Sequence, residues 1–136
     1  MGQQQLLLII LGVIIVGIAI AVGLSLFAAN SITANRDAII NDINNLAANA
    51  YQYRIRPASM AGGGGNYLGY TVPFKMSSND NATYTAAVVA GTGTAGSVTF
   101  TGTSMTTPDA STVVGAVDGG GKLTFDASTG FTGDFK

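Results

Sequence analysis

Few side chains in this sequence are suited to catalysis. The 136 residues include no Cys, His, Trp or Glu, which removes thiolate and imidazole metal ligands and the most common general base. The nucleophiles that remain are Ser and Thr hydroxyls near Lys75 or Lys122, and neither a G-x-S-x-G nor an S-x-x-K motif is present. We therefore expect no enzymatic activity and no cofactor.

The aspartates are the remaining candidates for binding a metal ion. Asp80, Asp118, Asp126 and Asp134 could supply oxygen ligands to calcium. Asp and Asn also favour turns without any metal, and turn formation explains all four positions. We therefore predict no metal site.

Two short motifs are candidate sites of their own. The run Gly62–Gly65 is rich in glycine, as phosphate-binding loops are, but no Lys-Ser or Lys-Thr pair follows it, so it predicts a flexible turn. Asn81 begins the sequon Asn-Ala-Thr, which makes it a candidate for N-glycosylation.

Charge and composition exclude several classes of partner. Six basic and seven acidic residues give a net charge of −1, so neither a nucleic-acid partner nor a polybasic membrane surface is predicted. The 19 glycines, together with the many threonines towards the C-terminal end, favour short strands and turns. A chain of this length accommodates one small domain and one long element.

The segment from Leu6 to Ala29 is apolar except for three Gly and one Ser. As a helix its 24 residues would measure about 36 Å, enough to cross a bilayer core of about 30 Å. It is longer than the roughly 7 to 15 apolar residues of a secretory signal. The segment therefore predicts a helix surrounded by lipid or by other apolar helices.

A helical pattern continues beyond the apolar segment. Pro57 is the first proline, so one helix is predicted from Gln3 to near Arg54. After Ala29 a single apolar stripe remains, and its spacing of three and four residues is that of a helix. The residues of this stripe predicted to pack on the C-terminal domain are Ile39, Ile43, Leu46, Ala50 and Tyr53.

The rest of the chain predicts a small β domain. Turn residues separate six short segments of strand-like sequence, and Asp118–Gly121 is predicted to be a hairpin turn. The expected fold is α+β, with a long helix in residues 1–56, hydrophobic in 1–29, packed on an antiparallel sheet in residues 57–136. The predicted strands are Tyr67–Phe74, Ala82–Ala90, Ser97–Thr101, Thr112–Val117, Lys122–Asp126 and Gly130–Phe135.

This order of elements resembles that of type IV pilins, pseudopilins and archaeal adhesion pilins. The resemblance covers the architecture of the whole chain, with its residue-level content in about the first 30 positions. It implies an N terminus processed and methylated at Met1 or after Gly2, and a polar contact at Gln5, where many bacterial pilins have a carboxylate. Val22 stands where bacterial pilins commonly have Pro.

The resemblance implies a structural subunit of an extracellular filament on the cell surface. The subunit would lie in the cytoplasmic membrane before an assembly machinery builds it into a helical homopolymer. The alternative is a single-pass membrane anchor that carries a small surface domain and does not polymerise. The residues expected in the filament core are Leu6, Leu7, Ile9, Ile10, Val13, Ile14, Ile15, Ile18, Val22 and Leu26.

Overall fold

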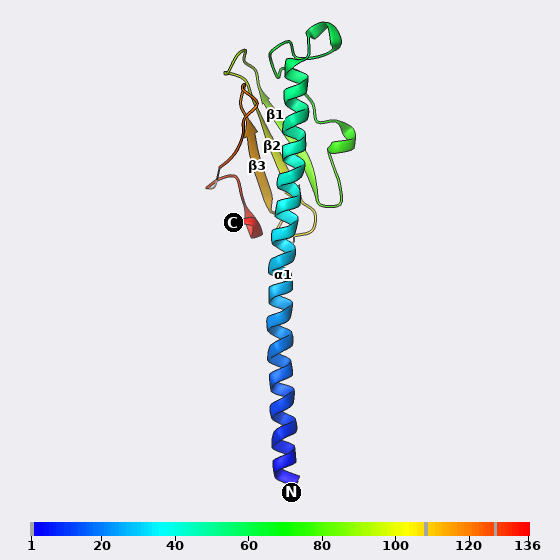
Figure 1. The fold of residues 1–136 in the computed structure, drawn as a ribbon, viewed down its shortest axis with the longest axis vertical. Helices are drawn as coiled ribbons and strands as arrows, with labels where there is room; N and C mark the ends of the chain where they lie inside the picture. The colour runs from blue at the N-terminus through cyan, green and yellow to red at the C-terminus, as the bar shows by residue number, and fades with distance from the viewer. Residues whose placement is uncertain (1, 108, 127) are drawn as a thin grey trace. The chain divides into compact units, whose positions relative to one another are not determined.

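The computed structural model describes residues 2–107, 109–126 and 128–136. They form an α+β fold, as predicted, with one long helix and a four-stranded sheet (Figure 1). The chain divides into two compact units, one that ends at Thr33 and a second from Ala34 to Lys136. In chain order the elements are α1 (Gly2–Ile55), η1 (Ala58–Met60), η2 (Phe74–Met76), β1 (Ala82–Val89), β2 (Ser97–Ser104), β3 (Thr112–Val117), β4 (Leu123–Phe125) and η3 (Gly133–Phe135).

The helix α1 has 54 residues and no break, which confirms the predicted single helix. It ends just before Pro57, which cannot donate a backbone hydrogen bond and disfavours helical geometry in the residue before it. The glycine run then turns back over the end of the helix. Gly63 N–H donates to the Tyr53 carbonyl at 2.8 Å and Gly65 N–H to the Arg54 carbonyl at 2.7 Å. The run therefore caps carbonyls that would otherwise lack a partner.

The sheet is an antiparallel meander in the order β1-β2-β3-β4. Buried residues alternate with half-buried ones along β2 and β3, because one face of the sheet packs on α1 and the other does not. Strands β1 and β3 lie where they were predicted, β2 extends three residues further, to Ser104, and β4 is shorter. The predicted hairpin at Asp118–Gly121 joins β3 to β4.

Two predicted strands are wrong. Tyr67–Phe74 is an irregular loop, because Tyr70 N–H closes a turn on the Tyr67 carbonyl at 2.9 Å and Gly69 has a positive φ of 84°. Gly130–Phe135 is bridged to the sheet only where Phe131 pairs with Val113 of β3. Gly133, at φ 63°, then turns the chain into η3. Of the aromatic residues in these two segments, Tyr67 and Tyr70 enter the core from a loop and Phe135 enters it from η3, whereas Phe74 is 93% exposed.

The C-terminal part of α1 packs on the sheet through Ile39 and Ile43, which are fully buried. Two glycines of the sheet make room for them. A methyl group on Gly102 would lie 2.6 Å from Ile39 Cγ2, and one on Gly115 would lie 3.1 Å from Ile43 Cγ2. Both contacts are closer than ordinary packing allows, so each glycine sets how near the helix approaches the sheet.

Replacing Gly102 with Ala should lower the free energy of unfolding by about 1–3 kcal/mol, because the added methyl group overpacks the contact with Ile39. Denaturant unfolding of the full chain in detergent, followed by circular dichroism, measures the change. Gly120→Ala is the matched control, because Gly120 is exposed in the β3–β4 hairpin. A Gly102→Ala variant as stable as Gly120→Ala would contradict this packing.

Three buried tyrosines, Tyr67, Tyr70 and Tyr84, connect the loops and the sheet to α1. The Tyr70 hydroxyl donates to Asn49 Oδ1 at 3.0 Å, and the Tyr84 hydroxyl donates to the Asp42 carboxylate. Burial raises the pKa of all three, that of Tyr70 to about 12. The hydrogen bond to Asp42 and its negative charge raise the pKa of Tyr84 further.

The raised tyrosine pKa values predict alkaline unfolding. The unfolded chain releases these protons near pH 10, while the folded chain keeps them. The tyrosines therefore contribute fully to the free energy of unfolding below pH 10, and this contribution falls as the pH rises above 10. Three protons give a slope of up to about 4 kcal/mol per pH unit. Denaturant titrations between pH 8 and 12 measure it. Tyr84→Phe should reduce the slope by about 1.4 kcal/mol per pH unit, and an unchanged slope would contradict the assignment.

Candidate functional site: the apolar half of α1

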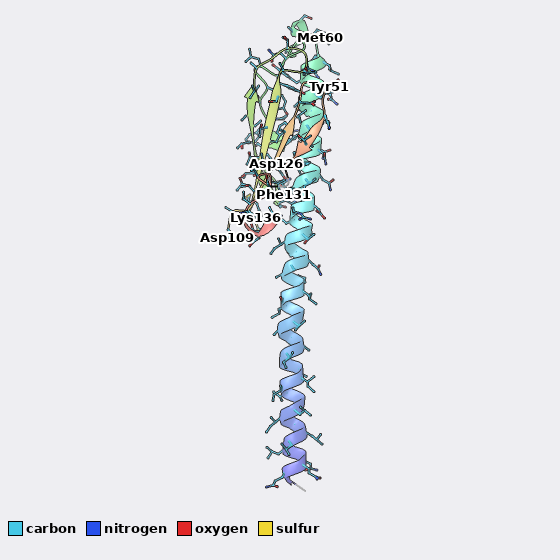
Figure 2. All side chains as sticks on the ribbon, turned by 90° about the vertical axis from the view of Figure 1, so that its left-hand side faces the viewer. Tyr51, Met60, Asp109, Asp126, Phe131 and Lys136 are labelled. Carbon is cyan, nitrogen blue, oxygen red and sulfur yellow. The ribbon has the colours of Figure 1, made fainter. Side chains whose placement is uncertain are left out.

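The apolar half of α1 exposes large hydrophobic side chains on every side. The ten residues predicted for a filament core are between 48% and 67% exposed, from Ile10 at the lower end to Leu7 and Val13 at the upper. Figure 2 shows the side chains of this part of α1 projecting on both sides of the helix. A surface helix of a globular protein has a single apolar stripe, which it buries against the core, so this half-helix is built for surroundings other than water.

The same segment is long and apolar enough to span a membrane. Its most hydrophobic 18-residue window has a mean hydropathy of 3.2, and none of that window is buried within the chain. Because every backbone group inside the helix is hydrogen-bonded to its own helix, both lipid and neighbouring helices can surround it without polar groups left unpaired. The geometry alone thus allows a membrane span or a helix bundle.

Gly2 and Gln5 lie in the exposed first turns of α1, and Met1 lies outside the described residues. The first turn of the helix, from Gly2 on, contains no acidic residue. Gln5 offers a neutral amide to the first backbone N–H groups and to any neighbour, so a contact there is a hydrogen bond without charge assistance.

Four of the five residues predicted to pack on the C-terminal domain are fully buried, namely Ile39, Ile43, Leu46 and Ala50. Tyr53 is only half-buried. Its hydroxyl donates to the Leu68 carbonyl at 2.9 Å, and its ring packs edge-on against Tyr70 with centroids 5.6 Å apart. Tyr53 therefore holds the loop after α1 rather than the sheet.

Asn81, the predicted glycosylation position, is half-buried immediately before β1. Its backbone N–H donates to Asn79 Oδ1 at 2.9 Å, and its carbonyl accepts from Asn35 Nδ2 at 3.4 Å. The third residue of the sequon, Thr83, is exposed. The backbone of the sequon is thus fixed between a turn and α1.

Two of the four candidate calcium ligands, Asp118 and Asp126, hold turns together. Asp118 Oδ1 accepts the backbone N–H groups of Gly120 and Lys122, both at 2.9 Å. The Asp126 carboxylate accepts hydrogen bonds from Thr129 and Ser128, which lower its pKa to about 2. Within the described ranges no three acidic side chains gather as they would around a metal.

Arg54 is a structural residue that sequence reasoning missed. From the sequence it is predicted only to lie near the end of the helix, yet its side chain is 9% exposed. Its guanidinium donates to the carbonyls of Gly119 and Gly93 and lies over the Tyr67 ring, 5.4 Å from the centroid. Arg54 follows Ala50 by four residues, so the helical period of the apolar stripe could have revealed it.

No protein-family model, curated protein or solved structure matches the chain.

Proposed function

We propose that this protein is the structural subunit of an extracellular, type IV pilus-like filament that polymerises through the apolar half of α1. The observation that carries the proposal is the 24-residue apolar segment from Leu6 to Ala29, whose large hydrophobic side chains are all exposed. Burial of one Leu or Ile side chain contributes about 1.5–3 kcal/mol. A helix with many such residues can hold a polymer together without covalent links.

Two features favour helix-helix packing over permanent residence in lipid. No charged residue lies between the segment and Arg36, and Phe27 is the only aromatic residue between Leu6 and Tyr51, so the C-terminal flank of the segment lacks the basic and aromatic anchors that usually fix a spanning helix. The segment also contains the small residues Gly12, Gly17 and Gly23. Small residues of this kind let neighbouring helices approach closely.

In this proposal the membrane is a stage before assembly. The subunit first spans the cytoplasmic membrane, and an assembly machinery then moves it into a filament in which copies of α1 replace the lipid. Its N terminus, at Met1 or after Gly2, would be processed and methylated before that step. The second unit, Ala34–Lys136, would form the filament surface. The competing function is a single-pass anchor with a small surface domain, which the hydropathy of the segment also supports.

Shearing of intact cells distinguishes the two functions. The sheared fraction, freed of membrane by centrifugation, is examined by electron microscopy and by mass spectrometry of its subunits. We expect thin filaments composed of this chain. If the chain remains with the membrane fraction and no polymer is released, the anchor function is correct.

A further inference from the structure

One face of the C-terminal part of α1 is polar and borders two separate pockets, which we together call the groove. Asp42, Asn45, Asn49 and Gln52 recur at steps of three and four residues, which places them in line on the helix surface, and Arg56 follows just after the end of α1. The chain from the end of α1 through η2 to β1 runs alongside this part of the helix (Figure 1). Two pockets lie between the helix face and this chain.

The first pocket has a volume of about 190 Å³ and is lined by Gln52 and Tyr53 of the helix, by Arg56 just after its end, and by loop residues near Tyr70. The Tyr70 hydroxyl donates a hydrogen bond to Asn49 Oδ1, so the Asn49 amide N–H groups remain free to donate to a ligand. Within the described part of the chain, the side chains of Gln52 and Arg56 form no hydrogen bond or ion pair. No acidic residue lines this pocket, so it carries the positive charge of Arg56.

The second pocket, of about 170 Å³, is lined by Asn45 and Lys75 among others. Asp42 also reaches it, but its carboxylate accepts hydrogen bonds from the Tyr84 hydroxyl and from Asn79 Nδ2. Lys75 and Asp42 balance each other in charge. The helical rise separates the two groups of lining residues by about 12 Å along α1.

The chemistry of the groove matches a chain of sugar rings. Amide side chains exchange hydrogen bonds with hydroxyl groups, and a tyrosine ring offers an apolar surface with a polar edge. Each pocket is smaller than the roughly 300–1,000 Å³ clefts that enclose drug-sized ligands, which suits a single ring. The guanidinium of Arg56 fits a carboxylate through paired charge-assisted hydrogen bonds.

We propose that this groove binds an acidic oligosaccharide, with a uronate carboxylate on Arg56 and a ring further along the same oligosaccharide at Asn45. This inference goes beyond the filament function and does not depend on it. The full chain is dispersed in a zwitterionic detergent without sugar groups, and binding of a galacturonic acid tetramer is measured by calorimetry. The comparison ligand is the same tetramer with its carboxyl groups reduced to alcohols.

Arg56→Gln should weaken binding of the acidic tetramer by about 10-fold or more and leave binding of the reduced tetramer unchanged. Gln52→Ala should weaken both ligands, because it removes hydrogen bonds to hydroxyl groups. The control is Lys136→Gln, which also removes one positive charge. Lys136 lies at the end of the sheet opposite to Met60, and α1 ends near Met60 (Figure 2). The control variant should bind like the wild type.

Three results would overturn the proposal. One is that the wild-type chain does not bind the acidic tetramer at millimolar concentration. Another is that inorganic sulfate competes as strongly as the tetramer, which would indicate a simple anion site. The third is an equal loss of affinity in Arg56→Gln and Lys136→Gln. Because all measurements use dispersed subunits, none of these results bears on whether the chain polymerises.

Discussion

Replacing Ile15 with Lys is expected to abolish filaments. Ile15 lies in the middle of the apolar segment and is 58% exposed in the isolated chain, so a polymer built on this helix would bury it against other copies. The substitution puts an ammonium group without a partner into an apolar bundle, which costs several kcal/mol. The cost recurs in every subunit, so the polymer has no copy that avoids it.

Electron microscopy of sheared material and a quantitative blot of the membrane fraction measure this effect. Ile15→Leu is the matched control and should polymerise normally. Lys75→Ala removes an exposed charge from the second unit and should also leave the filaments intact. Wild-type filaments should withstand high salt and dissolve in detergent. If Ile15→Lys subunits still form filaments, or if salt alone dissolves the wild type, contacts between the C-terminal units must hold the polymer.

Replacing Arg54 with Ala should lower the free energy of unfolding by about 3–5 kcal/mol. The substitution leaves the buried carbonyl of Gly119 and that of Gly93 without their donor and removes the cation from the Tyr67 ring. Both carbonyls belong to loops between strands. Without the hydrogen bonds from Arg54 to these loops, the sheet loosens at the end where α1 stops. Since small domains are stable by only about 5–15 kcal/mol, the loss is large.

Denaturant unfolding of the full chain in detergent, followed by tyrosine circular dichroism, measures the Arg54 effect. Arg54→Lys keeps the charge but cannot reach two carbonyls with one planar group, so it should lie between the wild type and Arg54→Ala. Lys136→Ala is the control for loss of an exposed positive charge. A destabilisation below about 1 kcal/mol in Arg54→Ala would show that the guanidinium contacts contribute little.

The elements with a strong local signal could be predicted from the sequence. The absence of Pro before residue 57 and the spacing of Ile39, Ile43 and Leu46 determine α1 and its buried face. Alternating residues and the turn at Asp118–Gly121 likewise determine β3 and its hairpin partner. In each case the pattern that defines the element lies within the element itself.

The features that depend on distant residues could not be predicted. Tyr67 and Tyr70 are of a residue type that is common in strands. Gly69 between them adopts a positive φ, however, and both rings enter the core from a loop. The contact of Gly102 with Ile39 joins residues that no local pattern connects. The two carbonyls bound by Arg54 come from separate loops, which only the folded sheet brings together.

The most direct test of the filament proposal is the accessibility of a single cysteine at position 15. The chain contains no Cys, so Ile15→Cys and Thr71→Cys each introduce one reporter thiol. Sheared, membrane-free filaments are treated with a charged thiol reagent. We predict that Thr71→Cys, at an exposed position of the second unit, reacts at once, whereas Ile15→Cys reacts only after the filaments are dissolved in denaturing detergent. Equal reaction of both thiols in intact filaments would contradict a polymer core formed by the apolar half of α1.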